Sequence, residues 1–286
     1  MLAMPSEYGP TARHRRLAAE LRRLRERAGL TPETAAGALG WSRTKLVRIE
    51  TAVNLPRVVD VERILDAYGG NDAVNAALMK LARDIRQRGW WASYDDVFSG
   101  SFAQLEDAAA SIDSWQTEVI PGLLQTEDYA RAVLESGNDD LAEVDRRLQV
   151  RMTRRVVLSR SNAPQFNAVI AEEVLRRPVG GPTVMRRQLQ ALLADAERPN
   201  VSIRVVPASL GNRPALGDGA IVIFAFAAPV ELDVAYVETM GGGLYIEDIA
   251  QVQRCKVTFD RIRGAALPED ESATLIARIG KEAHHA

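Results

Sequence analysis

The sequence predicts a mainly α-helical chain with an α+β C-terminal part: five short helices in a first domain, a helical linker, and then helices packed on a mixed β-sheet. Three observations lead to this fold class. The length of 286 residues favours two compact units. Apolar residues recur every three or four positions between residues 15 and 88. After Pro164, short runs rich in β-branched residues replace that spacing.

The first domain is predicted over residues 15–89, after a flexible N-terminal arm of residues 1–14. The arm is polar and contains two prolines and a glycine, a composition typical of irregular structure. The domain that follows shows helical spacing of apolar residues, interrupted by capping residues and glycines. We predict five helices there, at about 15–28, 32–39, 43–50, 58–68 and 72–88.

The second and third predicted helices are separated by a turn of about three residues. Thr31 suits the N-cap position, and Pro32 suits the first helical position, where its missing N–H is not needed. Gly40 ends this helix, and Ser42 can cap the next one. The inward face of that third helix would carry Leu46. The pattern therefore predicts two helices that pack across a tight turn.

The outward face of the third helix is basic and hydroxyl-rich, which indicates contact with DNA. The residues at its start and on its exposed side are Arg43, Thr44, Lys45 and Arg48. Arginine and lysine donate to guanine O6 and N7, and threonine offers a hydroxyl or a methyl group. Residues 1–70 contain 12 basic and 8 acidic residues, which favours a polyanionic partner. The alternative is a solvated basic face on an ordinary helical bundle.

Three further residues are candidates for phosphate contacts that would position this domain on a duplex. Thr31 and Ser42 lie near helix N-termini, and Arg57 lies in the loop before the fourth helix. Trp41 lies in the turn, and we interpret it as an aromatic lid over the small core rather than as a group that stacks on a base. One such motif reads only a half-site, so we expect a homodimer.

Residues 90–286 are predicted to form a sensory, dimerisation or interaction domain, helical over 90–163 and α+β over 164–286. The helical spacing and the turn residues set the element boundaries. The predicted helices cover 102–115, 126–135, 141–160, 182–197, 248–265 and 269–283. The predicted strands cover 166–171, 201–206, 219–226 and 234–238.

The segment LRRLRERAGLTPETAAGALGWSRTKLVRIE, residues 21–50, resembles the XRE-type, lambda-repressor-like helix-turn-helix family. Ala35 stands where that family has a small residue that lets the two helices approach, and Ile49 and Glu50 close the recognition helix. Pro32 is a departure, because the family often has a glutamine there that touches DNA. The resemblance implies a transcriptional regulator that binds double-stranded operator DNA.

Further strings are similar to the sensory or interaction region of a large actinomycete group of regulators, which includes WhiJ-like, antitoxin-like proteins. These strings are GWW at 89–91, VIPGLLQTEDYARAVL at 119–134, RRPVGGPTVMRRQLQALL at 176–193 and LYIED at 244–248. The resemblance implies a repressor-type protein paired with a small partner protein encoded nearby. Candidate residues for partner or ligand docking are Trp90, Trp91, Pro121, Leu123 and Leu124. Packing inside the domain is the alternative role for all five.

The chain shows no pattern for catalysis, a cofactor or a metal. Carboxylates near predicted strand ends offer metal ligands, but no His/Cys spacing, nucleophile elbow or phosphate loop accompanies them. These carboxylates are Glu172, Glu173, Asp218, Glu238, Glu247 and Asp248. Cys255 is the single cysteine, and no apolar segment suits a signal peptide or a membrane span. We therefore expect a cytoplasmic protein that is not an enzyme.

Two functions stay open at this point. The first is a DNA-binding regulator whose larger domain dimerises and receives a signal. The second is an antitoxin-like interaction module that sequesters a small partner protein, with DNA binding as autoregulation. The acidic excess of residues 71–286, 30 acidic against 24 basic residues, suits a basic partner in the second case.

Overall fold

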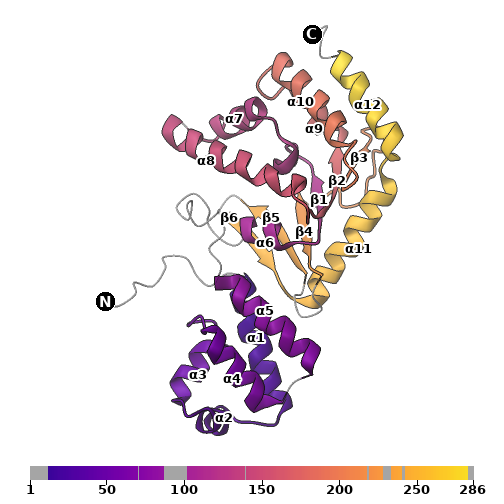
Figure 1. Ribbon diagram of the computed structural model, residues 1–286. Coiled ribbons are helices and arrows are strands. Elements are labelled where there is room, and N and C mark those ends of the chain that lie inside the picture. The colour runs from indigo at the N-terminus through magenta and orange to yellow at the C-terminus, as the bar shows by residue number, and fades with distance from the viewer. Residues whose placement is uncertain are drawn as a thin grey trace. The chain divides into compact units, whose positions relative to one another are not determined.

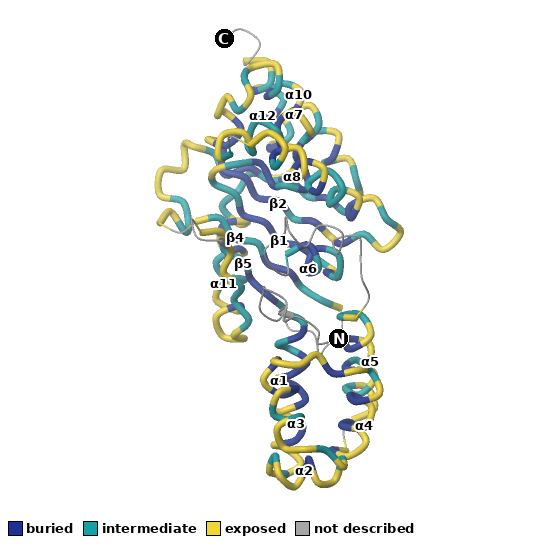
Figure 2. The backbone as a smooth tube through the Cα atoms, turned by 90° about the vertical axis from the view of Figure 1, so that its left-hand side faces the viewer, coloured by how far each residue is buried: buried dark blue, intermediate teal, exposed yellow. Residues whose placement is uncertain are grey.

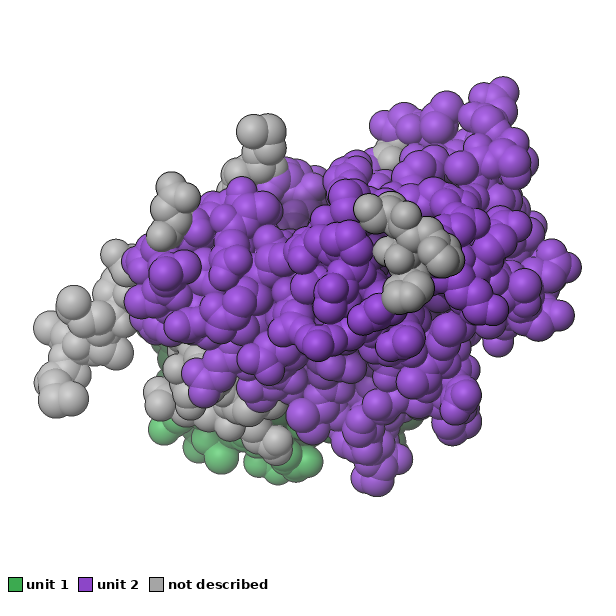
Figure 3. All heavy atoms as spheres, turned by 90° about the horizontal axis from the view of Figure 1, so that it is seen from above, with its two compact units in different colours: residues 1–104, 226–232 green, residues 105–225, 233–286 purple. Residues whose placement is uncertain are grey.

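The computed structural model describes residues 12–69, 71–86, 102–138, 140–217, 219–227, 233–239 and 242–282. The chain divides into two compact units, which Figure 3 colours separately. The first unit consists of residues 1–104 and 226–232, and the second of residues 105–225 and 233–286. The predicted fold class is confirmed, since helices form the first unit and a mixed sheet with helices forms the second.

The first unit contains the five predicted helices (Figure 1). They are α1 (Ala12–Arg27), α2 (Pro32–Leu39), α3 (Arg43–Glu50), α4 (Val58–Tyr68) and α5 (Asp72–Arg86). Helix α1 begins before the predicted start at Arg15, so the last residues of the proposed arm 1–14 are helical. His14 is buried there, with Nε2 3.3 Å from the carbonyl oxygen of Asn54. The rest of the arm, residues 1–11, lies outside the described residues.

The predicted capping residues set the boundaries of α2 and α3. The hydroxyl of Thr31 accepts a hydrogen bond from the backbone N–H of Thr34 at 3.1 Å, and Ser42 accepts one from Lys45 at 3.2 Å. Between the helices, Gly40 adopts a left-handed conformation with φ of 68°. Only glycine reaches this region without steric cost from a Cβ atom, which explains the sharp end of α2.

The core of the first unit is built from the inward faces of these helices, which are buried while the outer faces are exposed (Figure 2). Leu46 and Ile49 of α3 are among the buried residues, as the apolar spacing predicts. Ala35 of α2 is fully buried as well. Its small side chain permits the close approach of α2 to its neighbours.

A six-stranded mixed sheet organises the second unit. Its strands are β1 (Ser111–Gln116), β2 (Gln165–Ala171), β3 (Val201–Val206), β4 (Ile221–Ala225), β5 (Val234–Thr239) and β6 (Gly242–Ile246). The spatial order is β3-β2-β1-β4-β5-β6. Strand β2 runs parallel to both β1 and β3, and the remaining neighbours pair antiparallel.

Helices cover this sheet and each other (Figure 1). Helix α11 packs against β1, β3, β4 and β5, while α12 packs along β3 and against α10. Helices α7 and α8 form an adjacent pair, which two short 3₁₀ turns join to the rest of the unit. The helices are α6 (Phe102–Ala108), α7 (Glu127–Glu135), α8 (Leu141–Arg154), α9 (Glu172–Arg176), α10 (Pro182–Asp195), α11 (Ile249–Ala265) and α12 (Glu269–Glu282), and the turns are η2 (Gly122–Leu124) and η3 (Arg155–Ser159).

The prediction that residues 102–115 form one helix is wrong in its second half. Helix α6 ends at Ala108, and the strand β1 begins at Ser111. Tertiary pairing explains the difference, because β1 lies between β2 and β4 and its backbone groups are satisfied on both sides. The proposed helical stretch 90–163 therefore supplies a central strand. Helix α9 and strand β6 were not predicted, and the helix expected over 141–160 ends at Arg154 and continues as η3.

None of the described helices is both long enough and apolar enough to span a membrane.

Candidate nucleic-acid interface

The outer face of α3 is the candidate surface for DNA. Arg43, Thr44 and Arg48 are exposed, whereas Leu46 and Ile49 on the opposite face are buried. A helix anchored along one side presents the other side as a rigid ridge. The structure therefore places three of the four predicted base-reading residues on a single solvent-facing surface.

The two exposed arginines, Arg43 and Arg48, differ in how firmly they are held. The guanidinium of Arg43 pairs with Glu33 of α2, and both side chains are more than half exposed, at 62% and 60%. Exposed ion pairs of this kind contribute little free energy, so Arg43 can exchange Glu33 for another anion. In the part of the chain that the structure describes, Arg48 forms no ion pair with an acidic side chain. Arg48 therefore presents its guanidinium without a local competitor.

Lys45 is more constrained than the sequence predicts. Its Nζ lies 3.0 Å from Oδ1 of the buried Asp60 in α4. The same ammonium lies 3.5 Å from the ring centroid of Trp41. The Trp41 ring packs on the core of the first unit, which agrees with its interpretation as a lid. Lys45 thus joins α3 to α4, and a base contact by this residue would have to compete with Asp60.

Asp60 also holds Arg57, the predicted phosphate contact before α4. It accepts hydrogen bonds from Nε of Arg57 at 3.1 Å and from the Arg57 backbone N–H at 3.2 Å. Burial by itself would raise the pKa of Asp60, but the hydrogen bonds from Arg57 and Lys45 outweigh it, and the pKa lies below its ordinary value. The side chain of Arg57 remains 68% exposed and accessible to a phosphate.

This geometry predicts that Asp60→Asn lowers the free energy of unfolding by on the order of 1–2 kcal/mol at neutral pH. Because the folded pKa of Asp60 is depressed, its ionised form stabilises the protein above the unfolded pKa of about 4. That contribution is lost as the pH falls through the lower, folded value. The difference between wild type and variant in urea unfolding should therefore shrink below about pH 4.

The matched control for this measurement is Asp66→Asn, an exposed carboxylate on the same helix. It should change stability little at any pH. If the Asp60 variant loses the same free energy at acidic as at neutral pH, ionisation of Asp60 is not the source of the stabilisation.

Thr31 and Ser42 have capping roles that leave a phosphate contact possible. Each hydroxyl accepts a hydrogen bond from the first turn of the helix that follows. A hydroxyl that accepts one bond still carries its own proton. The hydroxyls of Thr31 and Thr34 lie 2.9 Å apart, and either one can donate to the other. The hydroxyl proton of Ser42 can be donated to an anion at the N-terminus of α3, where the helix dipole is favourable.

A buried ion pair fixes the C-terminal end of α3. Nε of Arg25 in α1 lies 2.9 Å and 3.0 Å from the two carboxylate oxygens of Glu50, and Nη1 donates to the carbonyl of Leu30 at 2.7 Å. The hydrogen bond to Glu50 raises the pKa of Arg25. The hydroxyl of Tyr68 adds a contact of 3.4 Å to Glu50. Arg25 was not among the site residues predicted from the sequence, although its position four residues after Leu21 places it on the apolar side of α1.

Comparison with protein families supports both parts of this description. Residues 16–78 match a helix-turn-helix domain, which supports a DNA-binding regulator. Residues 99–278 match a second model, described as a domain of unknown function, DUF5753. The chain belongs to the DUF5753 family. No curated protein and no solved structure gives a significant match to it.

The predicted docking residues of this DUF5753 protein lie mostly inside the second unit. Pro121 and Leu124 are buried, and Leu123 is 2% exposed at the floor of a pocket. Trp90 and Trp91 lie outside the described residues. The burial of the leucines favours the packing alternative for this segment.

Hydrogen bonds from buried polar side chains hold the same segment of the DUF5753 region in place. Oε1 of Gln188 accepts from the backbone N–H of Thr126 at 2.7 Å, and its Nε2 donates to the carbonyl of Leu124 at 2.8 Å. Nε2 of Gln125 donates to the carbonyl of Ile120 at 2.7 Å. Gln188 comes from α10, far along the chain, so only the fold reveals that it supports this loop.

Proposed function

We propose that the protein is a sequence-specific transcriptional regulator that reads operator DNA through α3. One observation carries the proposal: in a capped helix-turn-helix, Arg43, Thr44 and Arg48 form an exposed face opposite a buried one. A homodimer would place two such helices on successive half-sites of an operator in the cytoplasm. The resemblance to XRE-type and WhiJ-like regulators supports a repressor or autoregulator.

The structure suggests an order among the candidate contacts. Arg48 and Arg43 are the strongest candidates for base contacts. Arg48 has no acidic partner among the described residues, and the acidic partner of Arg43, Glu33, is exposed. Lys45 is a weaker candidate, since Asp60 and Trp41 hold it. Phosphate contacts fall to Ser42, Thr31 and the exposed end of Arg57.

Replacing Arg48 or Arg43 by alanine is expected to weaken operator binding by about 1–3 kcal/mol each if the residue reads a base. Fluorescence anisotropy titration at fixed salt measures this on an operator found by genome-wide footprinting. The loss should be smaller on unrelated duplexes, because base contacts specify sequence whereas phosphate contacts do not.

The control for these titrations is Arg83→Ala, an exposed arginine on α5 and away from the recognition helix. It should bind the operator as the wild type does. Unchanged affinity and unchanged sequence preference in both the Arg43 and Arg48 variants would rule out α3 as the reading helix.

An antitoxin-like function is the second candidate, and the acidic excess of residues 71–286 favours it. In that case the second unit sequesters a small basic partner protein, and DNA binding is autoregulatory. Purification of the tagged protein followed by mass spectrometry distinguishes the two. The antitoxin-like function is supported if a small basic protein co-purifies and changes the affinity of the chain for its operator. It is contradicted if the purified chain binds its operator fully, and is released from it, in the absence of any such protein.

A further inference from the structure

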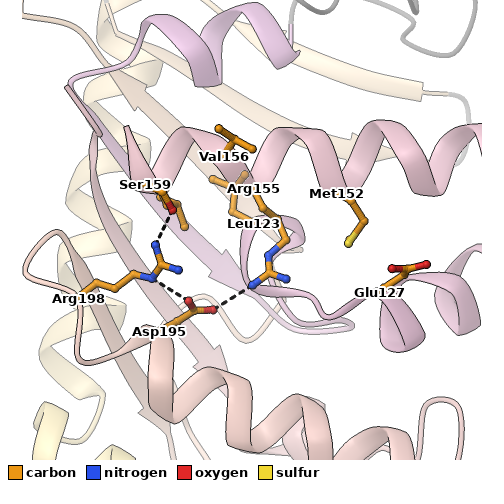
Figure 4. Close-up of a pocket in the computed structure, with 9 residues that line it drawn as sticks. Leu123, Glu127, Met152, Arg155, Val156, Ser159, Asp195 and Arg198 are labelled. Atoms are coloured by element: carbon orange, nitrogen blue, oxygen red, sulfur yellow. Dashed lines mark hydrogen bonds and ion pairs between the residues drawn. The ribbon is translucent and has the colours of Figure 1, made fainter. Parts of the chain in front are cut away.

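A pocket of about 390 Å³ lies in the second unit, where η2, the junction of α8 with η3, and the end of α10 meet (Figure 4). Its volume is in the range of small-molecule sites. Its walls combine a charged end with an apolar surface, and η3 contributes residues to both. Of the lining residues, only Leu123 is a docking candidate predicted from the sequence.

The charged end contains two arginines that share one carboxylate (Figure 4). Asp195 is 5% exposed. Nε of Arg198 lies 2.9 Å from its Oδ1, and Nη2 of Arg155 lies 3.5 Å from its Oδ2. Nη1 of Arg198 also donates to the hydroxyl of Ser159 at 2.8 Å. The two guanidiniums and Asp195 together therefore carry one uncompensated positive charge.

Both arginines retain hydrogen-bonding capacity toward the pocket. Their side chains are 30% and 38% exposed, for Arg155 and Arg198 respectively. A guanidinium carries five N–H donors, and the contacts to Asp195 and Ser159 use only some of them. The fixed forks of two arginines match the two oxygens of a carboxylate.

The apolar surface begins beside the two arginines. Leu123 and Leu158 are buried in the lining, at 2% and 4% exposed. Val156 also lines the pocket but is 64% exposed. Covering the exposed side chain of Val156 with the apolar part of a ligand would lower the free energy of the complex.

We propose that this pocket binds a small amphipathic monocarboxylate. The carboxylate lies against Arg155 and Arg198, and the aliphatic part covers the exposed Val156, next to the buried Leu123 and Leu158. The arginine end by itself carries one excess positive charge, which suits a monoanion. Glu127 at the opposite side of the pocket brings the charge of the whole lining to zero and opposes a dianion such as phosphate. This inference stands apart from the proposed function, because the binding requires no DNA.

The test is isothermal titration of the full chain, without DNA, with three probes: octanoate, octanamide and inorganic phosphate. Octanoate should bind, and octanamide, which lacks the charge, should bind about tenfold more weakly or worse. Three results overturn the proposal: no octanoate binding up to about 10 mM, equal binding of octanamide, or tighter binding of phosphate than of octanoate.

Two variants locate the site. Arg198→Gln should weaken octanoate binding about tenfold, and its control is Arg147→Gln, an exposed arginine of α8 that does not line the pocket. Val156→Glu places a negative charge at the rim and should weaken binding to a similar degree without changing the melting temperature, because Val156 is exposed. Its control is Val257→Glu, on α11. Wild-type affinity in both pocket variants would show that octanoate binds elsewhere.

Discussion

Replacing Glu50 by alanine is expected to destabilise the helix-turn-helix unit by about 3–5 kcal/mol and to abolish operator binding. The carboxylate is 4% exposed and Arg25 is 7% exposed, so the change leaves a guanidinium buried without its partner. It also removes the acceptor of the Tyr68 hydroxyl. The unit is small, and a loss of this size is a large part of the stability of an ordinary domain.

Hydrogen exchange of the full chain measures this loss of stability separately in the first and second units. Peptides from α1, α3 and α4 should lose protection, while peptides from the sheet of the second unit should not. Glu62→Ala is the control, because Glu62 is an exposed residue of α4. Protection of α3 equal to wild type in the Glu50 variant would show that the pair does not anchor the recognition helix.

A double replacement separates the cost of a buried charge from the loss of the pair. Arg25→Met combined with Glu50→Leu removes both charges and keeps apolar volume, so it should recover much of the protection lost by Glu50→Ala. Recovery of folding without recovery of operator binding would indicate that the pair also fixes the orientation of α3. An equally large loss in the double variant would point to packing rather than to charge.

The parts of the fold that the sequence predicted well depend on local chemistry. Thr31, Pro32, Gly40 and Ser42 act within a few residues of themselves, through capping and backbone conformation, so α2 and α3 begin and end as expected. The four predicted strands also agree with observed ones to within a few residues. Their β-branched character is a signal that each segment carries on its own.

The parts that the sequence did not predict depend on neighbours distant in the chain. The segment SIDSWQ becomes the strand β1 because residues 165–170 and 221–225 pair with it on its two sides. The same reason applies to the candidate site. Asp60 lies 15 residues after Lys45, so the restraint on Lys45 appears only once α3 and α4 are packed together. Exposure of Arg43 and Arg48 was predictable from helical spacing alone.

Replacing Leu124 by alanine is expected to cost about 2–5 kcal/mol in the second unit, because its side chain is fully buried. The η2 turn that carries it is fixed by Gln188, whose Nε2 donates to the Leu124 carbonyl. The surrounding structure therefore has little freedom to collapse into the cavity, which favours the upper part of this range. Thermal unfolding of the full chain, with hydrogen exchange to assign the affected unit, measures the loss.

This variant also discriminates between the two roles considered for the segment VIPGLLQT. If the segment serves packing, Leu124→Ala lowers stability, and any loss of partner or ligand binding follows from partial unfolding. If it is a docking patch, binding is lost while the melting temperature stays at its wild-type value. Leu141→Ala, on α8 and 64% exposed, is the matched control that should leave stability unchanged. The burial of Leu124 leads us to expect the first result, with docking confined to surfaces such as the exposed rim at Val156.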